Sequence, residues 1–158
     1  MRESQARANE ETVEAKRMAL ECFVCLRIRP EDVLKWAHLV FVEDAKVARV
    51  VGLKASEIIR QSYILKRTFL CGKGTKFALA GLFYLLAVMH DVRKTQRDIA
   101  ISFSISEVSV RTNFLRWLKT FPQFFPDFDL TASRGFTHPQ IVRFKGKRVN
   151  AMVARKGG

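Results

Sequence analysis

The stretch 95-TQRDIAISFSISEVSVRT-112 contains the pattern of two short helices joined by a tight turn. Thr95 stands at the N-cap position of a first helix, over about 96–102, and threonine is a favourable residue there. Ser106 stands at the same position before a second helix, over about 106–121, and an acidic residue follows it in the first turn. The spacing predicts a helix-turn-helix and raises the question of what the second helix presents on its outer side.

The second predicted helix has one continuous apolar stripe with the spacing i, i+4, i+7, i+8 and i+11. Such a stripe predicts the side of the helix that packs in a core. It is formed by Val110, Phe114, Trp117, Leu118 and Phe121. The side chains off the stripe are expected at the surface, and they are Val108, Ser109, Arg111, Thr112, Arg116 and Lys119.

Helical patterns also fill most of the chain before this motif. Hydrophobic spacing predicts five more helices, which cover about 8–28, 30–42, 43–51, 56–70 and 76–90. Gly52 marks the end of the third helix, and Ser56 marks the start of the fourth. The fifth is apolar on all sides and contains Gly81 among other small residues, which predicts a central helix that its neighbours approach closely. The predicted fold class is therefore an all-α bundle that ends in the helix-turn-helix.

Beyond the bundle, the pattern changes twice. Residues 122–138 have the composition of a linker rich in phenylalanine and proline. The aromatic run at 121–128 is expected to plug the bundle rather than form a partner-docking patch, because large apolar patches seldom stay exposed. Residues 139–158 predict a short basic β-hairpin around Gly146, followed by a tail. A winged helix with this hairpin as its wing is the alternative fold, ranked second because the connection is long, at roughly seventeen residues.

The chain is strongly basic, with a formal net charge of +13 and a pI near 10.2. Residues 1–41 are neutral overall, so the whole excess lies in 42–158. Such an excess favours a polyanionic partner, because neutralising phosphates releases counterions. An anionic membrane surface and a plain solvated basic surface are the alternative explanations.

Several classes of protein are not expected from this sequence. The longest apolar run, 77–89, is too short for a bilayer that needs about twenty residues, and residues 1–16 lack the apolar core of a signal peptide. We therefore expect a cytoplasmic, soluble protein without a membrane partner. Cys22 and Cys25 form a C-x-x-C pair inside an apolar helical stretch and have no second pair, so we expect buried small hydrophobes and neither a metal nor a cofactor. No catalytic motif is recognisable, so we expect neither an enzyme nor a small-molecule substrate.

Residues 43–121 resemble one cyclin-like repeat of the archaeal transcription initiation factor B family. "EDAKVARVVGLKASEI" is similar to the first helix of the repeat, and "GKGTKFALAGLFYLLAV" to its central helix. "KTQRDIAISFSISEVSVRTNFLRWLKTF" is similar to the closing helix-turn-helix of the family's second repeat. The resemblance implies a five-helix cyclin-like bundle at 43–121, with residues 1–42 as a helical extension. The family's zinc ribbon and a second recognisable repeat are missing from this sequence.

The resemblance also implies which residues meet nucleic acid. In the family's second repeat, the residues that match Val108 and Arg111 contact bases in the major groove. An arginine can hold guanine bidentately, and a valine can contact a thymine methyl group. The expected base contacts are Val108, Ser109, Arg111 and Thr112. The expected phosphate contacts are Lys73, Lys76, Lys94, Arg97, Arg116, Lys119, Arg143, Lys145, Lys147 and Arg148.

These observations predict a nucleic-acid-binding protein, with a DNA-binding, transcription-related relative of the initiation factor as the first hypothesis. A ribosomal or ribosome-associated protein that binds rRNA through its basic hairpin is the alternative. A cyclin module that docks proteins is the second alternative. In that case the helix-turn-helix is ordinary packing, and Arg111 forms an ion pair with Glu107.

Overall fold

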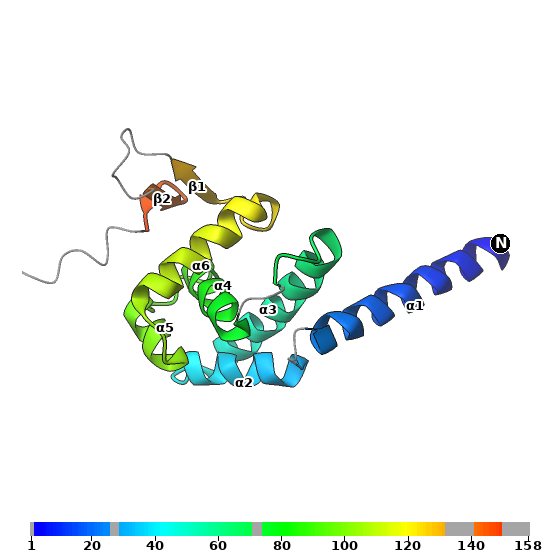
Figure 1. Cartoon of the computed structure of the whole chain (residues 1–158), viewed down its shortest axis with the longest axis horizontal. Helices are drawn as coiled ribbons and strands as arrows, with labels where there is room; N and C mark the ends of the chain where they lie inside the picture. The colour runs from blue at the N-terminus through cyan, green and yellow to red at the C-terminus, as the bar shows by residue number, and fades with distance from the viewer. Residues whose placement is uncertain (1, 26–28, 71–73, 132–140, 150–158) are drawn as a thin grey trace, which may run out of the picture.

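The computed structural model describes residues 2–25, 29–70, 74–131 and 141–149, and within the first helix it describes the side chains of 5–7 and 9–18. The described chain is mostly helical and ends in a small sheet (Figure 1). The helices are α1 (Arg2–Cys25), α2 (Pro30–Val40), α3 (Ala45–Leu65), α4 (Thr75–Met89), α5 (Gln96–Phe103) and α6 (Glu107–Thr120), followed by the 3-10 turn η1 (Pro122–Phe124). The strands are β1 (Phe128–Thr131), β2 (Ile141–Phe144) and β3 (Lys147–Arg148). The predicted fold class, a helical bundle with a C-terminal hairpin, is confirmed.

Helix α4 lies at the centre of the bundle, as its sequence predicts (Figure 1). Every side chain from Ala78 to Ala87 is buried. Helix α6 packs closely on it, and the Trp117 indole Nε1 donates a hydrogen bond of 2.9 Å to the Ala78 carbonyl. A Cβ atom on Gly81 would lie 2.6 Å from the Phe114 backbone nitrogen, so the missing side chain allows α4 and α6 to approach this closely.

The two helices predicted at 43–51 and from Ser56 are a single helix, α3, so the predicted break is wrong. Asp44 caps its start by accepting hydrogen bonds from the backbone of Lys46 and Val47. Gly52 does not end the helix. It packs against Leu34 of α2, whose Cδ2 atom would lie 2.7 Å from an added Cβ. The glycine therefore serves helix packing rather than helix termination.

Helix α2 belongs to the same core as the later helices. Val33, Ala37 and Val40 are buried, and the Trp36 ring stacks on Phe103 of α5 with 4.5 Å between ring centroids. Helices α2–α6 thus form a five-helix bundle.

Helix α1 extends away from this bundle, with the N-terminus at its far end (Figure 1). Its described side chains from residue 5 to 17 are exposed, so this part of α1 does not pack on the body of its own chain.

The aromatic run after α6 plugs the bundle, as predicted. Phe121 and Phe125 are each only 2% exposed. A continuous series of ring contacts leads from the core to the sheet through Trp117, Phe121, Phe124, Phe125, Phe128 and Phe144.

The sheet has three antiparallel strands in the order β1-β2-β3, one more than the sequence predicts. Strand β1 lies within the segment interpreted as a linker and pairs Phe128 with Phe144. Strands β2 and β3 form the predicted hairpin, and Lys145 and Gly146 at its tip both have positive φ, which suits a two-residue turn. Together, η1 and β1 cover seven residues of the connection between α6 and this hairpin.

Candidate nucleic-acid interface

The helix-turn-helix has the caps that its sequence predicts. The Thr95 hydroxyl accepts a hydrogen bond from the Asp98 backbone, and the Asp98 carboxylate accepts one from the Thr95 backbone. The Ser106 hydroxyl accepts from the Ser109 backbone at 3.1 Å. Between the helices, Ser104 adopts a left-handed conformation with φ of 54°. These local bonds fix where each of the two helices begins.

Helix α6 divides into a buried side and an outer side. The predicted stripe is buried from Val110 to Phe121. On the outer side, Val108 is 65% exposed, and Thr112 is exposed one turn later. An exposed valine here could contact an apolar group such as a thymine methyl, and Val42 and Ile101 are exposed to a similar degree.

The other two predicted base contacts are partly occupied within the protein. Ser109 is half-buried, and its hydroxyl lies 2.9 Å from the Ser106 hydroxyl, so it helps to cap α6. Arg111 is also half-buried, and its Nε donates a hydrogen bond of 3.3 Å to the Gln96 Oε1 atom. The alternative ion pair of Arg111 with Glu107 is not among the described contacts.

Gln96 is the first residue of α5 and is only 1% exposed, although its side chain is polar. Its Nε2 atom has no hydrogen-bond partner among the described residues. The amide lies beside the Tyr84 hydroxyl of α4. Burial raises the pKa of Tyr84, while the Gln96 amide and the positive charge of Arg111 partly offset this rise. Tyr84, Gln96 and Arg111 thus form a polar group that joins α4, α5 and α6.

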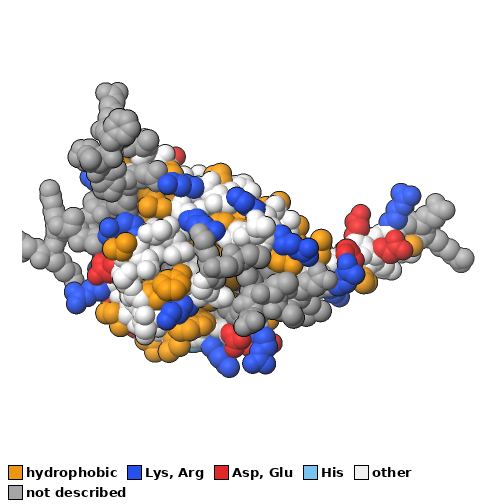
Figure 2. All heavy atoms as spheres, viewed as in Figure 1, with side chains coloured by type: hydrophobic (Ala, Val, Ile, Leu, Met, Phe, Trp, Pro, Cys, Tyr) orange, Lys and Arg blue, Asp and Glu red, His pale blue; other side chains and the backbone are white. Residues whose placement is uncertain are grey.

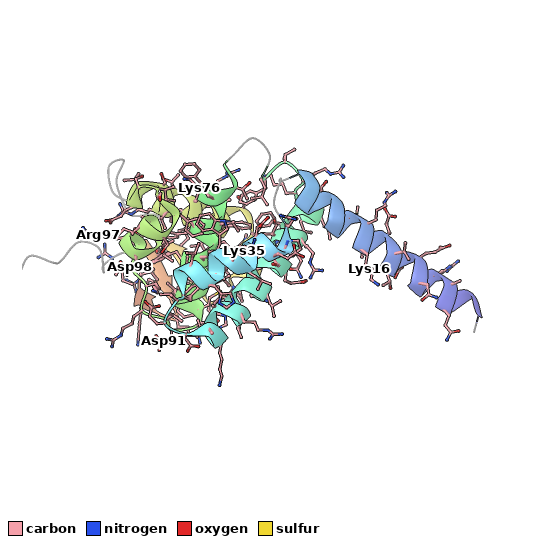
Figure 3. The ribbon with its side chains drawn as sticks, turned by 90° about the horizontal axis from the view of Figure 1, so that it is seen from below. Lys16, Lys35, Lys76, Asp91, Arg97 and Asp98 are labelled. Atoms are coloured by element: carbon pink, nitrogen blue, oxygen red, sulfur yellow. The ribbon has the colours of Figure 1, made fainter. Side chains whose placement is uncertain are left out.

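Among the predicted phosphate contacts on the helices, Lys76, Arg97 and Lys119 are exposed. Arg97 points away from the bundle at the α5 end of the body (Figure 3). Lys73, another predicted phosphate contact, lies outside the described residues.

Lys94 and Arg116 have partners inside the protein that the sequence analysis did not foresee. The Lys94 ammonium binds both carboxylate oxygens of Glu43 at 2.8 and 2.9 Å, and this partner lowers the pKa of Glu43. The Arg116 guanidinium donates to the Phe69 carbonyl at 2.6 Å and lies over the Phe69 ring, and burial lowers its pKa. Both cations therefore have partners within the protein, and their contact with phosphates stays a prediction.

The basic residues of the sheet divide between its two faces. Arg143 and Arg148 are exposed and directly opposite each other on β2 and β3, which places their side chains on one face. Lys147 is opposite Phe144, so it lies on the other face. Lys145 is at the tip, where its ammonium lies 5.4 Å from the centre of the Phe144 ring. On β1, Asp129 is directly opposite Arg143, so this face carries two arginines and one carboxylate.

Two residues of this region were missed by the sequence analysis. Ile101 is 67% exposed on α5. A signal existed, because Ile99, Ala100 and Phe103 already occupy the buried side of that helix and leave Ile101 off it. The burial of Gln96 could not be predicted from the sequence, because a glutamine in the first turn of a helix usually lies at the surface.

The wider surface agrees with the basic composition. In Figure 2, Lys and Arg side chains are spread over the visible face of the body, while several of the acidic side chains lie on α1. None of the described helices is both long and apolar enough to span a membrane. The side chains of Cys22 and Cys25 lie outside the described residues, so the expected absence of a metal site stays a prediction.

Comparison with known proteins shows a similarity over part of the chain. The chain is 34% identical over 65 residues to transcription initiation factor IIB 2 of Saccharolobus solfataricus. The match covers 41% of this chain and 22% of that protein, so the chain corresponds to about a fifth of its relative. No family model matches the chain, and no solved structure matches it. The similarity supports a relationship to transcription factor B over part of the chain.

Proposed function

We propose that this chain is a non-enzymatic, transcription-related protein that binds double-stranded DNA through α5 and α6. The observation that carries the proposal is the outer side of α6. There, Val108 and Thr112 are exposed and Arg111 is half-buried, while the opposite side of the helix is fixed in the core. A side chain that donates to guanine and one that contacts a thymine methyl are thus held on a rigid helix close to its start, as major-groove recognition requires.

Cations around this helix are suited to the DNA backbone. Arg97 on α5 and Lys119 near the end of α6 are exposed at opposite ends of the motif. Contacts of this kind set the register of a protein on the duplex without reading its sequence. The net charge of +13 supplies the attraction over longer distances.

The similarity to transcription initiation factor IIB 2 supports a role in transcription. Within transcription, we propose a regulatory or accessory role for this chain, carried by DNA binding through α5 and α6.

The proposal is tested by selection from a library of randomised DNA duplexes, followed by the same selection with Arg111→Ala. We expect the unsubstituted protein to select a preferred sequence. In Arg111→Ala, we expect the preference at one base position to be lost, which corresponds to about 1–3 kcal/mol of binding free energy. Arg49→Ala is the matched control, since Arg49 is exposed on α3 and its removal changes the net charge equally.

A uniform loss of affinity in Arg111→Ala, with the preferred sequence unchanged, would contradict base reading by α6. Binding to ribosomal RNA in preference to every duplex would favour the rRNA alternative. In that case, substitution of Arg143 and Arg148 on the sheet is expected to weaken binding more than any change in α6.

A further inference from the structure

The polar group beneath the outer side of α6 contains a residue whose burial needs an explanation. Among the described residues, Ser62 and Gln96 are the buried polar ones. Ser62 is satisfied by the Ile59 carbonyl at 2.8 Å. Gln96 accepts from Arg111 through its Oε1, while its Nε2 faces the Tyr84 hydroxyl without a hydrogen bond of good geometry. A buried amide in this state costs stability, so an apolar side chain of the same length would suit the core better.

We propose that Gln96 is a positioning residue that aims the Arg111 guanidinium at its base. This inference rests on the proposed function of α6 and adds a second residue, on α5, that determines sequence preference. Gln96 itself is too deeply buried to touch nucleic acid.

The geometry of the contact supports this role. The Gln96 Oε1 atom binds the Nε of Arg111, and the two Nη groups have no described partner. The Nη groups and Nε share one rigid plane, so fixing Nε also fixes the direction of the remaining donors. An arginine held in this way loses less side-chain entropy on binding a guanine, because its rotamer is already restricted.

The position of Gln96 in the chain makes it an effective anchor. It lies in the first turn of α5, directly after the Thr95 cap, and beside Tyr84 of the central helix α4. The direction of the Arg111 guanidinium therefore depends on contacts with α5 and the central helix α4, and not only on α6. Any shift of α5 relative to α6 would turn the guanidinium.

The test uses the full chain with two substitutions at one site. Gln96→Met removes the acceptor and keeps the shape of the side chain, whereas Gln96→Glu keeps an acceptor oxygen for Nε. Each is compared with Arg111→Ala in the duplex selection, in binding to a random-sequence duplex at fixed salt, and in thermal unfolding.

We expect Gln96→Met to lose preference by about fivefold or more at the base position that Arg111→Ala affects. Its affinity for random-sequence duplex should be unchanged, since no charge is lost. Its melting temperature should change little, since the lost hydrogen bond to Arg111 is offset by removal of a poorly satisfied buried amide. Gln96→Glu should retain the preference. A residue with a merely structural role would show the reverse, with a lower melting temperature and an intact preference.

The outcomes separate the two proposals. If Arg111→Ala loses preference and Gln96→Met keeps it, the positioning role is wrong while base reading stands. If Arg111→Ala itself keeps the preference, base reading and the positioning role both fall. Should Gln96→Met fail to fold, the proposal is tested instead on the unsubstituted protein without nucleic acid, by measuring solvent exchange of the Arg111 Nε proton by NMR. Protection of that proton from solvent exchange supports the hydrogen bond, and rapid exchange overturns the proposal.

Discussion

Replacing Gly81 with alanine is expected to destabilise the protein by about 2 kcal/mol, although alanine is the better helix former. An added Cβ would lie 2.6 Å from the Phe114 nitrogen, 2.7 Å from the Asn113 carbonyl carbon and 2.8 Å from the Asn113 Cβ. Two of these three atoms are backbone atoms of α6, so no side chain can turn away to relieve the contact. Helix α6 would have to move as a unit, against its Trp117 hydrogen bond to α4.

The magnitude follows from two opposing effects. Overpacking a well-packed interior costs about 1–3 kcal/mol, and the rigid backbone contacts place Gly81 at the upper end of this range. Alanine in place of glycine in a helix interior returns about 1 kcal/mol. The difference is a loss of about 2 kcal/mol, which corresponds to a fall in melting temperature of about 4–8 °C for a domain of this size.

Gly52→Ala provides the matched control, since it is the same substitution in another helix of the bundle. There the closest atom to an added Cβ is the Leu34 Cδ2 at 2.7 Å, the end of a flexible side chain, followed by the Ala37 Cβ at 3.2 Å. The smaller packing cost and the helix-propensity gain should nearly cancel. The assay is unfolding in urea and by heat, followed by circular dichroism. If Gly81→Ala were as stable as Gly52→Ala, the close approach of α4 and α6 would be refuted.

Three further predictions concern separate parts of the molecule. Ser104→Gly should raise the free energy of unfolding by about 0.5–1 kcal/mol, because glycine adopts the left-handed turn conformation without a steric cost; urea unfolding measures this, and a loss of stability would contradict the turn geometry. Arg148→Glu should stabilise the sheet by about 0.2–1 kcal/mol, since it replaces a like-charged neighbour of Arg143 by an opposite one, beside the Asp129 that already lies opposite Arg143 on β1. The same change should weaken binding to nucleic acid, and weaker binding with lower stability would instead indicate a structural role. Tyr84 should ionise above its ordinary pKa of 10.0, as followed by ultraviolet absorbance in comparison with Tyr84→Phe, which leaves one tyrosine of two. The raised pKa implies stability that is complete below pH 10.0 and is lost as the pH rises through the folded-state pKa; an unshifted titration would place this phenol in water.

The helix-turn-helix was predictable because its signals are local. Thr95 and Ser106 are each followed within three residues by the groups that they cap, and the stripe of α6 repeats within one helix. Sequence spacing records such relationships directly, so the boundaries of α5 and α6 agree with the expectation.

The errors in the prediction arise where distant segments meet. Gly52 was interpreted as a helix end, but its role depends on Leu34 of α2. Strand β1 is four residues long and gains its order from β2, across the segment that separates them. The partner of Lys94 was not predicted either, because Glu43 lies 51 positions away in the sequence. No local pattern contains these partners, because each is brought into contact only by the packing of the bundle.

The same distinction explains why α6 can be both a core element and a recognition surface. Its buried side is fixed through Phe114 and Trp117, so changes there alter stability and the position of the whole helix together. Its outer side carries Val108 and Thr112, which make few contacts within the protein and can change at little cost to stability. Arg111 lies between the two sides: it is half-buried, and the direction of its side chain depends on the hydrogen bond to Gln96. Sequence preference in this fold is therefore expected to change most readily at Val108 and Thr112, and to depend on both members of the pair wherever arginine is retained at position 111.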